Sequence, residues 1–281
     1  MSVKLHREVG LVGFICPMHQ QGVTIDEHCV KCCTPCRDLD ELLAMFSPRA
    51  IVPKKYRTTE ILNPRQIIYF SRNFPYYLSP DSMSGAAIGT AWHEARERQV
   101  RKHRDRYFKH ITIEEENEFV KDFGFCTLGG KPDKFDHEIR KLTDIKTAKA
   151  YSVNKFLHDH WKDSTWHSYQ QQTNIYRIYK FPNTKTIELD VTVVGWDRYV
   201  NNVGINDKLR QIVPFLDDDK LDEWVRNRLE DIMEDQETGN PPPCPEEDMW
   251  INKNGEPQRC LRFCGGKAYC QQFIDWEKSR R

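Results

Sequence analysis

Asp133, Asp144 and Lys146 have the chemistry and the spacing of a metal-dependent hydrolytic site. Residues two apart in a β-strand share a face, so a strand through Asp144-Ile145-Lys146 presents the carboxylate and the ammonium on one side. Pairing with the strand beside Asp133 would bring two carboxylates together, and such a pair binds a hard dication, Mg²⁺ or Mn²⁺. The lysine then orients a metal-bound water or helps to deprotonate it. Phosphodiester hydrolysis requires this combination.

The elements around these residues are predicted to alternate between helix and strand, which indicates a mixed α/β body. A turn is expected at Gly129-Gly130-Lys131-Pro132, between two paired strands. Three helices are expected over residues 86–108, 166–179 and 222–237, and three strands over residues 119–128, 138–147 and 186–196.

The Asp-x-Lys pattern alone is weak, because it recurs at Asp218-Asp219-Lys220 and because an aspartate and a lysine on a strand can be a solvated ion pair. Three further motifs accompany Asp144-Ile145-Lys146. They are Gly89 to His93 on the first helix, Gly130-Lys131-Pro132-Asp133 at the turn, and Gln172 to Tyr176 on the second helix.

In this order, the four motifs resemble those of the PD-(D/E)XK nucleases, in particular the RecB-like branch with phage recombination exonucleases and CRISPR-associated RecB-like exonucleases. The resemblance covers about residues 60–200. It implies a restriction-endonuclease-like mixed sheet flanked by helices. It also implies that Asp133, Asp144 and the Ile145 carbonyl bind the catalytic metal, with His93 as a further ligand. Lys146 would serve the attacking water, and Gln172 and Tyr176 would position Lys146 or the DNA backbone.

Each assignment has a structural alternative. His93 could be a buried, hydrogen-bonded histidine without a metal. The glutamine of the last motif could be Gln170 or Gln171, although only Gln172 has a tyrosine four residues later. Seven Lys or Arg residues between Arg96 and His110 could track phosphates or form a solvated helix face.

A cysteine-rich head has the spacing of a zinc ribbon, in which each of two turns contributes one pair of ligands. Our first choice for the Zn²⁺ ligands is Cys16, His19, Cys29 and Cys32. Cys33 and Cys36 are alternatives for the second pair. A segment this short buries little core, so metal binding would supply much of its folding energy.

A second cysteine group lies in the tail, at Cys244, Cys260, Cys264 and Cys270. Four thiolates suit tetrahedral Zn²⁺ or a [4Fe–4S] cluster. The family resemblance favours the cluster, because several RecB-like nucleases close the fold with one. The arrangement departs from their commonest pattern, in which one cysteine precedes the nuclease motifs and three follow, so zinc stays an alternative.

The cysteines divide the 281 residues into a head (1–40), an α/β body (41–240) and a tail (241–281) that opens at Pro241-Pro242-Pro243. Lys+Arg and Asp+Glu both total 42, so net charge does not indicate a nucleic-acid partner. No segment has the roughly 18 apolar residues of a membrane span. Cysteines with metal-ligand spacing indicate a reducing, intracellular compartment. The resemblance to phage-type nucleases implies the cytoplasm of a bacterium or of a phage-infected cell.

The function predicted from the sequence is a metal-dependent DNA nuclease of phage-type recombination, replication or repair, with protein partners from those processes and no membrane. An exonuclease is favoured over an endonuclease by the resemblance alone. One alternative is a non-catalytic nucleic-acid-binding or adaptor protein with a vestigial site, which the intact Asp133, Asp144 and Lys146 argue against. Another is a restriction-type endonuclease.

Overall fold

The computed structural model describes residues 9–16, 22–23, 51–78, 80–194 and 208–280. The chain forms two compact units. We call Lys54–Leu62 with Ile88–Leu229 the sheet unit, and Met1–Pro53, Asn63–Ala87 and Glu230–Arg281 the cysteine unit.

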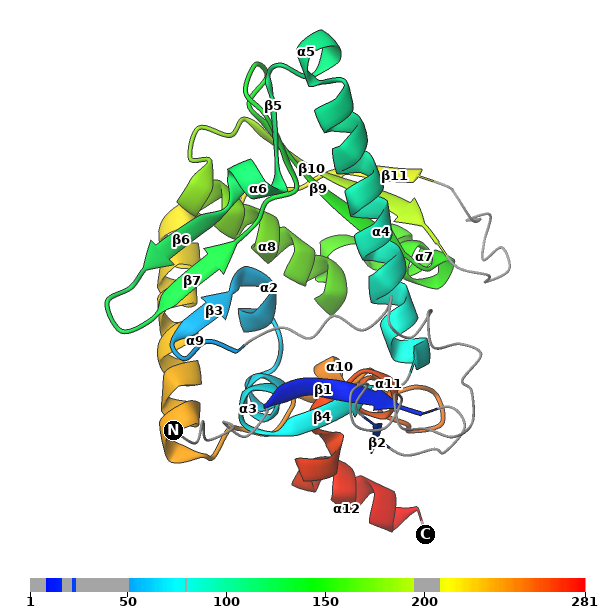
Figure 1. Cartoon of the computed structure of the whole chain (residues 1–281). Coiled ribbons are helices and arrows are strands. Elements are labelled where there is room, and N and C mark those ends of the chain that lie inside the picture. Colours follow the sequence, from blue (N-terminus) through cyan, green and yellow to red (C-terminus); the bar gives the residue numbers. More distant parts are fainter. Residues whose placement is uncertain (1–8, 17–21, 24–50, 79, 195–207, 281) are drawn as a thin grey trace, which may run out of the picture. The chain divides into compact units, whose positions relative to one another are not determined.

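The sheet unit is a mixed α/β structure with two sheets and flanking helices (Figure 1). Its helices, of which α4 and α9 continue into the cysteine unit, are α2 (Thr58–Ile61), α4 (Pro80–Lys102), α5 (Arg104–Tyr107), α6 (Glu114–Asn117), α7 (Ala150–Asp159), η2 (His160–Lys162), α8 (Ser164–Lys180) and α9 (Asp218–Thr238). Its strands are β3 (Lys55–Arg57), β5 (Ile111–Ile113), β6 (Phe119–Asp122), β7 (Thr127–Gly130), β8 (Lys134–Asp136), β9 (Lys141–Ala148), β10 (Thr186–Val193) and β11 (Lys208–Ile212).

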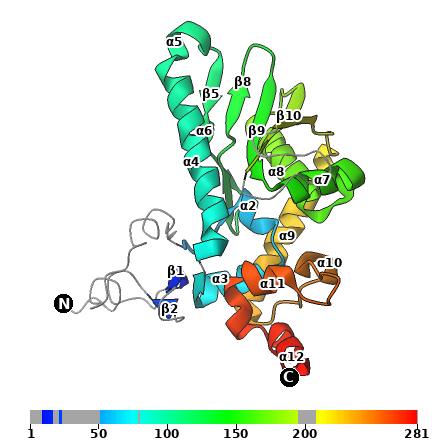
Figure 2. The ribbon, with the colours of Figure 1, turned by 90° about the vertical axis from the view of Figure 1, so that its right-hand side faces the viewer.

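A five-stranded mixed sheet in the order β11-β10-β9-β8-β5 forms the core of the sheet unit. β9 and β10 are parallel, and the other neighbours are antiparallel. Because β9 is central, its residues 142–145 are all buried. Figure 2 shows α4 on one side of this sheet and α7 and α8 on the other. The second sheet has the order β3-β7-β6.

The helices that flank this sheet follow the sequence pattern closely. The helix predicted over residues 166–179 is α8, and its N-cap Asp163 accepts hydrogen bonds from the amides of Thr165 and Trp166. The helix predicted over residues 222–237 lies within α9, and the one over 86–108 is α4 followed by α5. The strand predicted over 186–196 is β10, although residues from 195 onward lie outside the described part.

The strand predicted over residues 119–128 is wrong, because β6 and β7 form an antiparallel hairpin. The chain reverses at Gly124, which has a φ of 87° and donates its amide to Asp122 Oδ1 at 2.8 Å. Gly130 belongs to β7 and not to the predicted turn. A Cβ at Gly130 would lie 2.6 Å from ring carbons of Phe119 and Tyr176, so packing requires this glycine.

The cysteine unit contains the strand order β2-β1-β4, with β1 (Gly10–Ile15), β2 (Gly22–Val23) and β4 (Pro75–Leu78). Because β1 pairs with β4, the first strand of the predicted head is part of this sheet. The three-part division of the chain itself stays a prediction. The unit's helices are α3 (Arg65–Asn73), α10 (Glu246–Met249), α11 (Gln258–Arg262), η3 (Gly265–Tyr269) and α12 (Gln271–Ser279).

Candidate active site

The central strand β9 carries Asp144 and Lys146 on one face, as the alternation predicts. Asp144 is 1% exposed, and Lys146 Nζ lies 2.8 Å from Asp144 Oδ2. Lys146 also lies above the ring of Tyr169 on α8, 5.2 Å from its centroid. A carboxylate and an ammonium therefore share a buried position on the most protected strand of the sheet.

Asp133 immediately precedes β8, which pairs with β9. Its Oδ2 accepts a hydrogen bond of 2.6 Å from the backbone amide of Ile145, and the residue is 8% exposed. The structure thus brings together the two aspartates and the lysine that the sequence singles out, through the strand pairing that the sequence analysis requires.

His93 on α4 joins this group. Its Nδ1 lies 3.5 Å from Asp133 Oδ1 and 3.6 Å from Glu114 Oε1. Glu114, the first residue of α6, is a member of the site that sequence reasoning missed. The only signal was the run Glu114-Glu115-Glu116, which reads as the solvated start of a helix.

Burial and neighbouring charges together set the pKa values of these residues. Burial alone would lower the pKa of His93, but hydrogen bonds with Asp133 and Glu114 outweigh it and raise that pKa to about 10. Burial raises the pKa of Asp144 to about 6, although the charge of Lys146 opposes the shift. Burial would lower the pKa of Lys146, but Asp144 and Asp133 raise it overall. Without a bound cation, His93 and Lys146 are both protonated at neutral pH.

These residues fit a divalent cation. Asp144 Oδ1 has no hydrogen-bond partner among the described residues, whereas Oδ2 pairs with the ammonium of Lys146 at 2.8 Å, and both oxygens are buried. A buried carboxylate oxygen without a donor is costly, and a bound cation would satisfy it. Carboxylate oxygens and an imidazole nitrogen are metal ligands, so Asp144, Asp133 and His93 form a suitable donor set.

Gln172 and Tyr176 lie on α8, and both are buried. Gln172 Nε2 donates to Tyr176 Oη at 2.9 Å, whereas Gln170 Nε2 donates to the carbonyl of Pro214. The glutamine that partners the tyrosine is therefore Gln172, as its spacing predicts. The charges of Asp144 and Lys146 both act on the pKa of Tyr176, so the pair belongs to the surroundings of Lys146.

Three of the seven basic residues between Arg96 and His110 form ion pairs with acidic residues of the protein. These ion pairs join α4 and α5 to β10 and α6: Arg96 to Asp190 at 2.8 Å, Arg101 to Glu115 at 3.1 Å and Arg104 to Glu116 at 2.5 Å. Phosphate contacts from this run would therefore depend mainly on its other members, such as Arg98 and Lys102.

The four tail cysteines lie close enough to influence one another. Cys260, Cys264 and Cys270 are buried, and Cys244 is half-buried. Burial raises the pKa of Cys244 to about 12 and that of Cys260 to about 11, and the neighbouring thiols add to both shifts. Of the predicted head ligands, Cys16 is buried, whereas His19, Cys29, Cys32 and the alternatives Cys33 and Cys36 lie outside the described residues.

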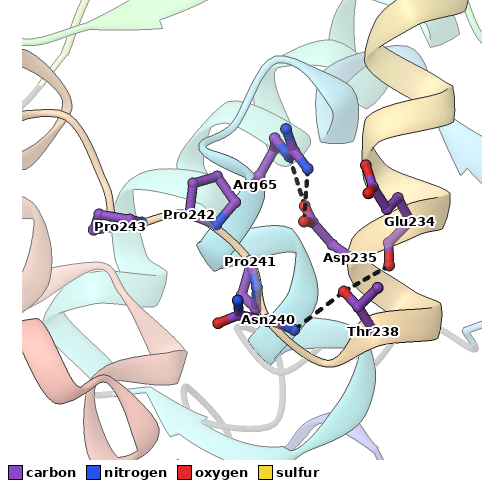
Figure 3. Close-up of a pocket in the computed structure, with 8 residues that line it drawn as sticks. All are labelled: Arg65, Glu234, Asp235, Thr238, Asn240, Pro241, Pro242 and Pro243. Atoms are coloured by element: carbon purple, nitrogen blue, oxygen red, sulfur yellow. Dashed lines mark hydrogen bonds and ion pairs between the residues drawn. The ribbon is translucent and has the colours of Figure 1, made fainter.

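A pocket with a volume of about 440 Å³ lies in the cysteine unit, whereas Asp133 and Asp144 belong to the sheet unit. Figure 3 shows the residues that line this pocket. Arg65 and Asp235 meet there through two hydrogen bonds of 2.7 Å. The charges of Arg65 and Asp235 therefore balance each other in this pocket. Its lining consists of Arg65, Glu234, Asp235, Thr238, Asn240, Pro241, Pro242 and Pro243.

No family model matches this chain, and no curated protein matches it. Among solved structures, that described as the crystal structure of SSO0001 has 14% identity and a TM-score of 0.46, over 84% of this chain and 92% of its own. An alkaline exonuclease (LHK-Exo) from Laribacter hongkongensis has 12% identity and a TM-score of 0.37, over 66% of this chain and 89% of its own. Matches of this degree assign neither a family nor an activity. Within the described residues, no helix has the length and apolar character of a membrane span.

Proposed function

We propose that this protein is a metal-dependent nuclease that hydrolyses phosphodiester bonds in DNA. The observation that carries the proposal is the convergence of Asp133, Asp144, Lys146 and His93 beside β9, where the buried Asp144 Oδ1 has no hydrogen-bond partner among the described residues. The four sequence motifs that resemble RecB-like PD-(D/E)XK nucleases place the same residues in one site.

Each residue has a distinct task in this reaction. A divalent cation, Mg²⁺ or Mn²⁺, would polarise the phosphate and lower the pKa of its bound water. Asp133, Asp144 and the Ile145 carbonyl would hold it, with His93 as a further ligand. Lys146, protonated beside Asp144, orients the water and offsets negative charge on the phosphate. Gln172 and Tyr176, which hydrogen-bond to each other on α8, would position Lys146 or the DNA backbone.

Hydrolysis forms a bond between the water oxygen and phosphorus while the bond from phosphorus to the leaving sugar oxygen breaks. The water loses one proton to solvent, and the leaving oxygen gains one. Because Lys146 already carries its proton, it is suited to donating a hydrogen bond and not to removing the proton from water. We propose DNA with ends as the substrate, and recombination, replication or repair in a bacterial or phage-infected cytoplasm as the setting, on the resemblance alone.

The test uses end-labelled linear and circular DNA, single- and double-stranded, with Mg²⁺, Mn²⁺ or EDTA. A nuclease cleaves with metal and not with EDTA, and an exonuclease spares the circles. Asp144→Asn should abolish cleavage, whereas Asp218→Asn, in the second Asp-x-Lys match, should keep it, because Asp218 is exposed and pairs with Arg177. DNA binding without cleavage under every condition would support the adaptor alternative, and cleaved circles would support an endonuclease.

For the tail, we propose a [4Fe–4S] cluster on Cys244, Cys260, Cys264 and Cys270. The thiols of Cys260, Cys264 and Cys270 all act on the pKa of Cys244, so the four cysteines lie near one another. Four cysteines suit such a cluster, and the family resemblance favours it over zinc.

For the head, we propose one Zn²⁺ on Cys16, His19, Cys29 and Cys32. Deleting residues 1–40 is a poor test, because the deletion also removes β1 and its pairing with β4. Cys29→Ser in the full chain should instead lower the zinc content by one equivalent while leaving cleavage intact. Unchanged zinc content would contradict this assignment.

A further inference from the structure

The central strand β9 extends beyond its neighbour β8 on the side of the candidate active site. The pairing of β8 with β9 ends opposite Thr143, and Asp133 then reaches one step further, to the amide of Ile145. Among the described strands, only β10 accompanies β9 over residues 146–148. The five-stranded sheet is therefore narrowest at the carboxyl end of β9, beside the two aspartates.

The helix α7 begins after a single residue that follows this end of β9. Its buried residues, Ala150, Val153 and Phe156, recur every three positions and form one face of the helix. Tyr151 lies outside this face and is 67% exposed, the largest exposed fraction among the large hydrophobic side chains of the described residues. Leu157, on the same helix, is 46% exposed. Tyr151 thus presents most of its ring to solvent, three residues after the strand ends.

Tyr151 is linked to Lys146 by a short series of neighbouring side chains on α7 and α8. A hydrogen bond with Asp163 raises the pKa of Lys155, and Tyr151 contributes to the same shift. Burial raises the pKa of Tyr169, and Asp163 contributes to that shift. Lys146 Nζ lies 5.2 Å from the centroid of the Tyr169 ring. Because Lys146 and Tyr151 are five positions apart in the chain, their Cα atoms are at most about 18 Å apart.

A cation without a partner lies beside this ring. Lys149, the residue before α7, is exposed, and its ammonium forms no ion pair or hydrogen bond within the described part of the chain. The first turn of α7 contains no acidic residue. Single exposed apolar side chains are common on protein surfaces, so exposure alone does not indicate a partner. An exposed aromatic ring next to an unpaired ammonium is the combination that binds single-stranded nucleic acid.

We propose that Tyr151 and Lys149 bind a single-stranded segment of DNA beside the active site, where the ring stacks on a base and the ammonium contacts a phosphate. Bases in a duplex already stack on one another and face inward, so an exposed ring on a helix finds no free base there. The nuclease would then act on single strands or on unpaired ends. That this strand is the substrate rests on the proposed function, whereas its binding does not.

The experiment measures binding of the full-length protein to a fluorescent single-stranded oligonucleotide and to its duplex, by anisotropy without added divalent cation. Tyr151→Ala should weaken single-strand binding about 5–150-fold, the loss of one stacked base, and change duplex binding less than about twofold. Tyr151→Phe keeps the ring and should bind like the wild type. Leu157→Ala is the matched control, because it shortens another exposed side chain of α7. Equal unfolding temperatures of these variants exclude a folding defect.

The salt dependence of binding tests the second contact. Lys149→Ala should reduce the slope of log affinity against log salt concentration by about 0.7 on the single strand, the loss of one phosphate contact. No binding of single strands by the wild type, or an equal loss on both forms of DNA in Tyr151→Ala, would overturn this site, as would wild-type affinity of that variant. Single-strand binding that depends on Tyr151, in a protein that cleaves no DNA with any metal, would overturn the proposed function and leave this site standing.

Discussion

Ile145 donates its backbone amide to Asp133 Oδ2 over 2.6 Å. The amide belongs to the residue that follows Asp144, so one hydrogen bond ties the aspartate before β8 to the strand that carries the other aspartate and Lys146. The separation of the two carboxylates is therefore set by backbone geometry and not by flexible side chains alone. Single substitutions in this site should therefore have measurable effects on cleavage and on stability.

Lys146→Ala should reduce cleavage about 10²–10⁴-fold, because it removes the group that orients the attacking water. Metal binding should persist, since both carboxylates remain. Lys141→Ala is the matched control on the same strand, because Lys141 pairs with Glu188. Single-turnover cleavage rates and Mn²⁺ titration of both variants give the comparison. Wild-type cleavage by Lys146→Ala would show that the active site lies elsewhere.

Stability of the cation-free protein should depend on His93 in a defined pH window. The pKa of His93 is about 10 in the folded state and 6.5 at its ordinary value, so folding favours the protonated ring. This contribution is fully present below pH 6.5 and is lost as pH rises through 10. The unfolding temperature in EDTA, measured for the wild type and His93→Gln, should differ most at low pH and converge towards pH 10. A difference that grows with pH would contradict the assigned ion pairs.

Gly130→Ala should cost about 1–3 kcal/mol of folding free energy, because the new Cβ would meet Phe119, Tyr176 and Thr58 at 2.6–2.8 Å. Gly129→Ala is the neighbouring control, since its Cβ would meet nothing closer than 3.4 Å. Urea unfolding gives the free energies. Cleavage should fall further in Gly130→Ala than the loss of folded protein explains, because Tyr176 must move. Equal stability of the two variants would contradict this packing.

Protein purified without oxygen should be brown if the tail holds a [4Fe–4S] cluster, and Cys264→Ala should lose the visible absorption band and the iron. Cys126→Ala is the control, because Cys126 is buried in the sheet unit, away from the tail sequence. Iron and acid-labile sulfide analysis measures the content. Colourless protein whose tail contains only zinc would contradict the cluster and support a zinc site.

The placement of residues in the candidate site is largely predictable from the sequence where local spacing sets it. Alternation on one strand places Asp144 with Lys146, and a four-residue helical spacing joins Gln172 to Tyr176. Glu114 was not predictable, because its partners His93 and Asp133 come from other elements and its neighbours resemble a solvated helix start. Tyr169 was missed for the same reason, since only the packing of α8 against β9 brings its ring to Lys146.

The predicted strand boundaries are wrong near two glycines, because glycine can have more than one structural role. Gly124 and Gly130 look alike in sequence, but the first reverses the chain at a positive φ and the second leaves room for two aromatic rings. Composition cannot separate these two roles, because the second depends on residues that lie far away in the chain. The part-buried ion pair of Arg96 with Asp190 is likewise not visible in the sequence, because only the packing of α4 against β10 brings the two residues together.

Because β9 pairs with β10 in parallel, we expect the parts of the site to form in a definite order during folding. β8 and β9 are neighbours in the chain, so their hairpin closes a short loop, whereas the paired residues Lys141 and Thr186 are about 45 residues apart. Non-local pairing forms more slowly than local pairing, and the intervening crossover includes α8 with Gln172 and Tyr176. A chain still emerging from the ribosome would hold the two aspartates together before Lys146 is buried. The arrangement that the proposed hydrolysis needs is then completed only after residues up to the end of β10 have been synthesised.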